Sequence, residues 1–167
     1  MECILFRHGI ALDPQDWKEA EALRPLSPDG KKKTRKAVAG LRRLGVTPTQ
    51  LWSSPLTRAI QTAELIRSTF RLREDIQIHD ALLPDAPPEE LMKVVASLPD
   101  NACAIFVGHE PHLGATASVM LFGRANGGLS LKKAGSCSVR FDEKPRAGRG
   151  TLNWWLMPSQ LRNLASA

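Results

Sequence analysis

Three polar groups in the sequence carry residue types that suit phosphate chemistry. Arg7-His8-Gly9 follows a short apolar run near the N-terminus, Arg58 follows Ser53-Ser54-Pro55, and His109 follows the apolar run 102–108. An arginine presents a planar fork of donors that meets two phosphoryl oxygens at once. A histidine ring nitrogen that carries no proton can attack phosphorus. These residues predict a phosphate site in which His8 is the nucleophile.

The positions of these residues matter more than any one of them. A lone histidine at the end of a strand is more often a bystander than a catalyst, and Arg58 by itself would be interpreted as a surface helix residue. His79 and His112 are interpreted as structural or pocket-lining residues. The same kind of residue recurs at three predicted strand ends, which favours a functional site. Nearby arginines should lower the pKa of His8, and His109 is expected to donate a hydrogen bond to the transferring group.

The first half of the chain predicts elements that place these residues. Residues 2–7 form an apolar run typical of a short buried strand, and residues 10–26 are polar and irregular, as in a loop. Ser27-Pro28 is a typical N-cap followed by proline and predicts a helix to about Leu44, which Gly45 ends.

A second strand and helix follow. Residues 51–53 predict the strand, and Ser54-Pro55 repeats the cap-and-proline pattern at the start of the helix. The helix carries one apolar stripe, made of Ile60, Ala63, Ile66 and Phe70. Its free N–H groups and positive dipole end would point at the same site.

The second half of the chain continues the alternation of strands and helices. The predicted elements are a weak strand at 76–79, a helix from Pro87 to about Leu98, a strand at 102–108, a helix from about Pro111 to Phe122, strands at 136–142 and 151–157, and a short closing helix from Pro158. This order predicts an α/β three-layer sandwich with a central, mainly parallel sheet and a C-terminal antiparallel hairpin.

No internal repeat or linker divides the chain, so its 167 residues predict a single domain over 1–167. In open sheets of this class, ligands bind beyond the carboxyl ends of the strands. If the strands are parallel neighbours, we expect Arg7, His8, Arg58 and His109 to converge there.

Composition narrows the classes of protein. Hydrophobic residues make up 43% and charged residues 24% of the chain, as in ordinary globular proteins. No apolar run approaches the roughly 20 residues that span a bilayer, and the apolar segment 3–6 is too short for a signal peptide, so we expect a cytoplasmic protein with no membrane partner. Cys3, Cys103 and Cys137 share no metal-ligand spacing and are expected to be buried, reduced thiols.

The formal net charge of +6 has two interpretations. It fits a phosphate pocket with scattered surface charge, and it fits a partner such as nucleic acid. The densest basic run, residues 31–36, has the spacing of an exposed helix face, and no aromatic stacking motif accompanies it. We therefore expect no nucleic-acid partner and keep a non-catalytic phosphate- or nucleic-acid-binding module as a distant alternative.

The ordered set of motifs resembles a known family. Arg7-His8-Gly9 after an N-terminal strand, the segment 53–62 and Gly108-His109 resemble three sequence blocks of the histidine phosphatase superfamily, which has the phosphoglycerate mutase-like fold. The short chain and the segments 24–27, 108–111 and 153–158 resemble the SixA phosphohistidine phosphatases within it.

The resemblance implies a role for each matching residue. His8 becomes phosphorylated, Arg7, Arg58 and His109 bind and stabilise the phosphoryl group, and Arg24 is a further phosphate contact. No cofactor and no metal are implied, and the sequence holds no metal-ligand spacing. The substrate would be a protein that carries phosphohistidine, such as a phosphotransfer domain.

One departure from the family pattern concerns the general acid. Many members have a glutamate in the middle of the chain, whereas residues 82–87 hold no clear match; Asp85 is the nearest candidate and Glu110 is an alternative. An alkoxide leaving group benefits from a proton donor, but an imidazole, with a pKa of about 6.5, can leave without one. The gap favours phosphohistidine as substrate. The alternative is a broad-specificity phosphomonoesterase of the same fold that acts on small molecules.

Overall fold

The computed structural model describes residues 1–166 and confirms the predicted α/β class. Its sheet has the strand order β3-β2-β4-β1-β5-β6. The strands are β1 (Glu2–Arg7), β2 (Gln50–Ser53), β3 (Gln77–Ile78), β4 (Cys103–Gly108), β5 (Ser136–Arg140) and β6 (Thr151–Leu156). The first four are mutually parallel, β5 runs antiparallel to β1, and β6 runs antiparallel to β5. The sheet is thus mainly parallel with an antiparallel C-terminal pair, as predicted.

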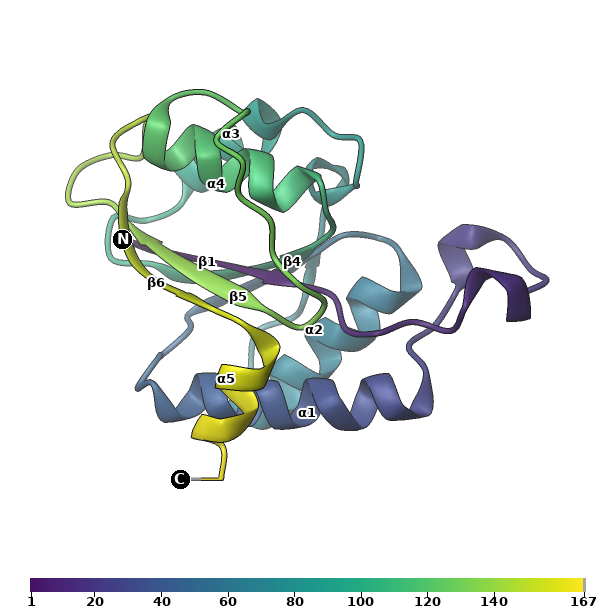
Figure 1. Cartoon of the computed structure of the whole chain (residues 1–167). Helices are drawn as coiled ribbons and strands as arrows, with labels where there is room; N and C mark the ends of the chain where they lie inside the picture. The colour runs from purple at the N-terminus through teal and green to yellow at the C-terminus, as the bar shows by residue number, and fades with distance from the viewer. Residues whose placement is uncertain (167) are drawn as a thin grey trace.

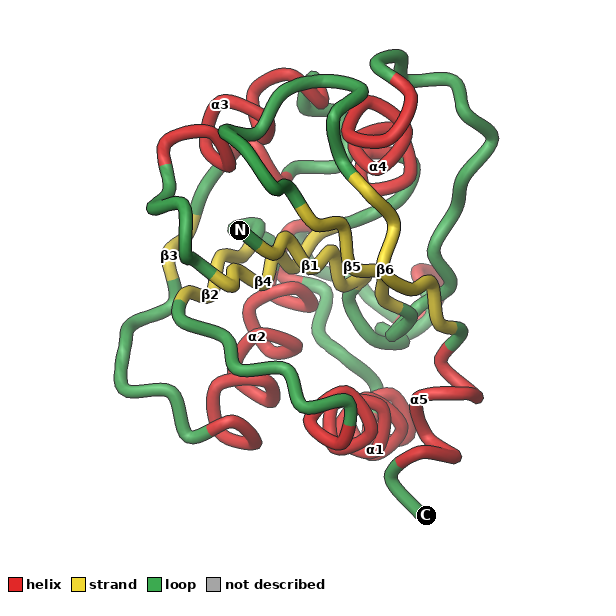
Figure 2. Tube along the Cα trace, turned by 90° about the vertical axis from the view of Figure 1, so that its left-hand side faces the viewer, coloured by secondary structure: helices red, strands yellow, loops and turns green. Residues whose placement is uncertain are grey.

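Helices cover both faces of this sheet (Figure 2). The helices on one face are α1 (Pro28–Arg43), α2 (Thr57–Phe70) and α5 (Pro158–Leu164), and those on the other are α3 (Pro88–Ser97) and α4 (His112–Phe122). Three short 3-10 helices lie in the connections: η1 (Pro14–Asp16), η2 (Glu21–Leu23) and η3 (Asp80–Leu82). No helix within residues 1–166 is long and apolar enough to cross a membrane.

Successive side chains of β1 point to opposite faces of the sheet and pack into two apolar cores. Ile4 and Phe6 pack toward α1 and α2, whereas Cys3 and Leu5 pack toward α3 and α4. Every residue of β4 is buried, as expected for a central strand that helices cover on both faces. In the pairing register, Arg7 stands opposite Gly108, so β1 and β4 end at the same edge of the sheet.

Close packing and capping fix α1. The Ser27 hydroxyl accepts a hydrogen bond from the Gly30 N–H, and Gly45 has a φ of +76°, so both predicted end signals are confirmed. Gly40 lies against α5 so closely that a Cβ there would overlap the Leu161 carbonyl. The basic residues of the run 31–36 are exposed, as predicted for a solvated helix face.

The start of α2 differs from its prediction. The helix begins at Thr57 with Leu56 as its N-cap residue, and Ser54 does not cap it. The Ser54 hydroxyl instead contacts the Leu56 N–H and the His109 ring. The predicted apolar stripe is correct at Ala63 and Ile66, which are fully buried.

The loop predicted over 10–26 is more ordered than its composition indicates. It holds η1 and η2 and closes through a bridge between Ala11 and Leu26. Its middle part, residues 13–23, stands out from the body of the molecule (Figure 1), and we call it the 13–23 arm. The three cysteines are buried and free, as predicted.

Candidate active site

His8 lies directly after β1 and is only 6% exposed. Its Nδ1 is 2.7 Å from the Gly9 carbonyl oxygen. A carbonyl oxygen only accepts hydrogen bonds, so Nδ1 must carry the proton of the neutral ring. The lone pair of that ring is therefore on Nε2, the nitrogen that can act as a nucleophile.

Burial and nearby cations keep this ring neutral. Burial is the main cause that lowers the pKa of His8, to about 3, and the positive charges of Arg58, Arg7 and Lys133 lower it further. The bond to the Gly9 carbonyl acts in the opposite direction. At neutral pH Nε2 of His8 is therefore unprotonated. The arginines lower the pKa as predicted, but burial, which the sequence did not indicate, is the larger cause.

His109, from the end of β4, lies beside His8. The centroids of the two rings are 4.9 Å apart. His109 Nε2 is 2.8 Å from the Ser54 hydroxyl oxygen, which also accepts the Leu56 N–H at 3.3 Å. When the Ser54 hydroxyl donates to Nε2, the His109 proton is on Nδ1, a buried atom that has no partner among the described residues.

Two arginines of the site are anchored by backbone carbonyls. Arg7 Nη1 donates to the Leu131 carbonyl at 2.7 Å, and Arg58 Nη1 donates to the Glu21 carbonyl at 3.2 Å. The Nε atoms of both arginines are buried and have no hydrogen-bond partner among the described residues. Anchoring fixes the guanidinium groups, and their buried Nε–H donors have no acceptor among residues 1–166.

Two buried donors without acceptors, the Nε atoms of Arg7 and Arg58, therefore belong to the side chains whose charges act on His8, and Nδ1 of His109 is a third donor in the tautomer in which Ser54 donates to Nε2. Buried donors without acceptors are unfavourable and rare in folded proteins. An anion with several acceptor oxygens would satisfy them together, and a phosphoryl group is such an anion.

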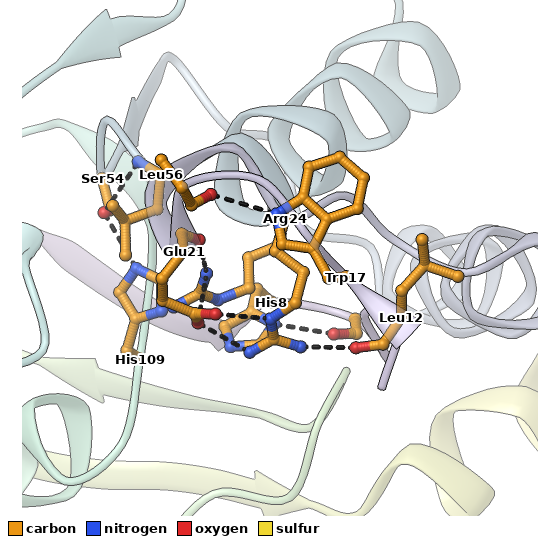
Figure 3. Close-up of polar contacts among 11 residues, drawn as sticks. His8, Leu12, Trp17, Glu21, Arg24, Ser54, Leu56 and His109 are labelled. Atoms are coloured by element: carbon orange, nitrogen blue, oxygen red, sulfur yellow. Dashed lines mark hydrogen bonds and ion pairs between the residues drawn. The ribbon is translucent and has the colours of Figure 1, made fainter. Parts of the chain in front are cut away.

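Arg24, which directly follows the 13–23 arm, approaches the same place. Its Nε and Nη2 atoms both lie 2.8 Å from carboxylate oxygens of Glu21, and its Nη1 donates to the Leu12 carbonyl (Figure 3). Glu21 Oε1 also lies 3.3 Å from Arg58 Nη1. Glu21 therefore links the predicted phosphate contact Arg24 to Arg58.

Neither general-acid candidate from the sequence contacts His8. Asp85 is exposed and forms no hydrogen bond or ion pair with residues 1–166. Glu110 Oε1 accepts the Leu131 N–H at 2.8 Å, and its other oxygen lies near Gly114. Burial raises the pKa of Glu110, and the neighbouring Arg7 opposes this rise.

Sequence reasoning missed three residues around the site. Ser54 was interpreted only as a helix cap, although its place after β2 would have supported a role beside His109. Lys133 and Glu21 gave no signal, because both lie in irregular segments whose approach to His8 depends on the tertiary fold. Within residues 1–166, no group of three or more His, Cys, Asp or Glu side chains is arranged to hold a metal ion.

Comparison with known proteins finds one matching family and one similar protein. Residues 3–83 match the model of the histidine phosphatase superfamily (branch 1). An uncharacterized protein of Picosynechococcus sp. is 38% identical over 146 residues, which cover 84% of this chain and 85% of the relative.

Solved structures share the fold at lower identity. The protein histidine phosphatase SixA in complex with tungstate has a TM-score of 0.84 at 24% identity, covering 96% of this chain and 99% of its own. A phosphoserine phosphatase from Entamoeba histolytica, in complex with 3-phosphoglyceric acid, has a TM-score of 0.68 at 16% identity, with 96% and 98% covered. Similarity at this level of identity establishes the fold and leaves the substrate open.

Proposed function

Because the chain belongs to the histidine phosphatase superfamily (branch 1), we propose that it removes phosphate from a phosphorylated histidine of a protein, through a phosphohistidine formed on His8. The observation that carries the proposal is the set of unpartnered buried donors on Arg7, Arg58 and His109, gathered around a neutral histidine. The structural likeness to SixA supports the choice of substrate.

In the first step, the Nε2 lone pair of His8 attacks phosphorus while the P–N bond of the substrate breaks. The bonding pair returns to the substrate ring, which leaves as neutral imidazole because its other nitrogen already carries a proton. The donors of Arg58, Arg7 and His109 stabilise the charge on the equatorial oxygens. The Gly9 carbonyl, which accepts the Nδ1–H bond, stabilises the positive charge that the His8 ring gains.

In the second step, water attacks the phosphorus of phosphorylated His8 in line with the Nε2–P bond. The bonding pair returns to Nε2, and both hydrogens of the water leave with phosphate. His8 is again neutral with its proton on Nδ1, so the site is ready for another turnover. The same donors serve both steps because the transferring group keeps its three equatorial oxygens in one place.

The carboxyl groups near the site support phosphohistidine over phosphoesters. Glu110 faces Leu131 and Gly114, Asp85 is exposed, and the hydrogen bonds from Arg24 lower the pKa of Glu21. Neither Asp85 nor Glu110 contacts His8, and Glu21 is ion-paired with Arg24 and Arg58. This arrangement suits imidazole, which leaves without a proton donor, better than an alkoxide.

A second candidate function rests on Glu110. Burial raises the pKa of this carboxyl group, which lies close enough to Arg7 to feel its charge. If Glu110 turned to donate that proton, small phosphomonoesters would be substrates of the same site. Their turnover would then depend on Glu110, whereas phosphohistidine turnover would not.

The test compares wild type, His8→Ala and the control variant His79→Ala, since His79 is exposed and caps η3. Each is incubated with a phosphohistidine protein and with an alkyl phosphate monoester. We expect acid-labile phosphate to be trapped on His8, and His8→Ala to lose at least about a thousandfold in turnover. Unchanged turnover in His8→Ala would overturn the proposal. Equal rates on both substrates, lost in Glu110→Gln only for the ester, would favour the second candidate.

A further inference from the structure

Glu21 brings a negative charge to the arginines of the proposed phosphate site. Its carboxylate meets Arg24 through two contacts of 2.8 Å and Arg58 through one of 3.3 Å. The side chains of Arg24 and Arg58 are 12% and 8% exposed, whereas that of Glu21 is 60% exposed. A solvent-exposed carboxylate on the 13–23 arm thus contacts two largely buried cations, of which Figure 3 labels Arg24.

A carboxylate and a phosphoryl group bind an arginine in the same geometry. Each presents oxygens that accept two parallel N–H bonds from one guanidinium group. The Glu21 carboxylate therefore occupies the Nε and Nη2 donors of Arg24 and partly offsets the charge of Arg58, the two residues that the proposed function assigns to the phosphoryl group. Both anions cannot hold all of these donors at once.

Each of the two arginines also has a backbone contact that does not involve the carboxylate. Arg24 Nη1 is bound by the Leu12 carbonyl, and Arg58 Nη1 is bound by the backbone carbonyl of Glu21, which a side-chain change does not remove. The Glu21 side chain, in contrast, has solvent on most of its surface and is free to swing outward. The mobile partner of this contact is thus the carboxylate.

We propose that the Glu21 carboxylate is a resident anion that competes with phosphate for Arg24 and Arg58, leaves when the phosphoryl group enters, and returns as inorganic phosphate departs. This inference rests on the proposed function in one respect, namely that Arg24 and Arg58 hold the phosphoryl group. It adds a residue that sets the affinity of the site for its substrate and product.

The physical reason for such a residue is charge balance. Arg24 and Arg58 are close enough to repel each other, and the carboxylate offsets this repulsion while the site is empty. A phosphoryl group, with more charge and a third oxygen, replaces the carboxylate with a net gain. The measured affinity for phosphate reflects only the difference between its interaction free energy with the arginines and that of the Glu21 carboxylate. The product phosphate is therefore bound less tightly than it would be without Glu21.

The test compares wild type with Glu21→Gln and with the control variant Glu19→Gln. Glu19 is an exposed acid of the same arm that forms no ion pair with residues 1–166, so it controls for the loss of one negative charge. Calorimetric titration gives the dissociation constants of inorganic phosphate and of tungstate. We expect Glu21→Gln to bind both anions about tenfold more tightly than wild type, and Glu19→Gln to differ by less than about twofold.

The inference is overturned if Glu21→Gln binds these anions as wild type does or more weakly, since Glu21 would then only position the arginines. Equal tightening in both variants also overturns it, because long-range charge would explain the change. Binding that follows the expectation, without hydrolysis of phosphohistidine by wild type, would refute the proposed function and leave the role of Glu21 intact. If no variant binds either anion, the inference about Glu21 fails, and the proposed function is still decided by the turnover of His8→Ala.

Discussion

His8 owes its chemical state to contacts that are present before any substrate binds. Burial and the neighbouring Arg58 and Arg7 lower its pKa, and the Gly9 carbonyl fixes the proton on Nδ1. His109 is held in the same way, since burial lowers its pKa to about 2 and Ser54 contacts its Nε2. Two neutral rings thus lie side by side among cations, and the lone pair of His8 is on its Nε2.

The ionisation of His8 gives a prediction at this scale. Because the pKa of His8 is about 3, the ring should stay neutral from pH 7.5 down to pH 5, whereas an ordinary histidine would gain a proton near pH 6.5. NMR titration of the ring resonances, assigned by their loss in His8→Gln, measures this directly. The same protein unfolded in urea provides the control and should titrate near pH 6.5. A folded-state midpoint close to 6.5 would contradict the prediction.

At the scale of elements, the predictable features were those that depend on neighbours in sequence. Ser27-Pro28 correctly marked the start of α1, because the Ser27 hydroxyl needs only the Gly30 N–H within the same turn. The same pattern at Ser54-Pro55 failed, because His109, which is 55 positions away, takes part of the bonding capacity of Ser54. Local patterns thus identify an element, and tertiary contacts decide how its terminal residues are used.

The contacts of Glu21 with Arg24 and Arg58 were likewise not predictable from local sequence patterns. The sequence placed Arg7, His8, Arg58 and His109 at one edge because parallel strands end together. It gave no indication that Glu21 reaches Arg58 across 37 positions, since nothing periodic marks an irregular arm. Residue patterns therefore predicted the candidate site residues that follow strands. Among the loop residues, the family resemblance indicated Arg24, and nothing indicated Glu21.

The contact between α1 and α5 supplies a prediction at the scale of elements. A Cβ at position 40 would overlap the Leu161 carbonyl, so Gly40→Ala should force the helices apart and lower the free energy of unfolding by about 1–3 kcal/mol. Gly40 lies roughly 18 Å along the helix from the N-terminus of α1, so phosphatase activity should change by less than about twofold. Urea unfolding and kinetics measure the two effects. Lys36→Ala, on the exposed face of α1, is the control.

An unaltered free energy of unfolding in Gly40→Ala would mean that α5 shifts without loss of packing. A large loss of activity at unchanged stability would instead mean that α5 positions the site.

At the scale of the whole molecule, two apolar cores lie on either side of one sheet. The candidate site lies at the edge of the sheet where β1 and β4 end, next to buried histidines. His8, His109 and His112 are all nearly inaccessible, and burial is the main cause that lowers the pKa of each. Such residues remain neutral in the folded protein but gain protons in the unfolded chain once the pH falls below about 6.5. The stability of the whole fold is therefore linked to pH through these buried histidines.

The sign of this linkage gives the last prediction. Each lowered histidine pKa contributes stability that is complete above pH 6.5 and is lost as the pH falls toward the folded-state value, which is about 4 for His112. The free energy of unfolding should thus decrease by about 1.4 kcal/mol per pH unit for each histidine between pH 6 and pH 4.5. In His112→Gln the slope should be smaller by that amount. Urea unfolding at several pH values measures both slopes, and parallel slopes would count against the prediction.

The hydrogen bond between His8 Nδ1 and the Gly9 carbonyl has one more consequence, a regiochemical one. Histidine forms two isomeric phosphoramidates, since phosphorus bonds either to the ring nitrogen nearer the backbone or to the one farther away. The Gly9 carbonyl blocks the nearer nitrogen, so the proposed phosphoenzyme is the τ isomer alone. A substrate with either isomer of phosphohistidine would thus give the same τ-phosphohistidine on His8 before hydrolysis. The isomer found on the enzyme would therefore not reveal which isomer the substrate carried.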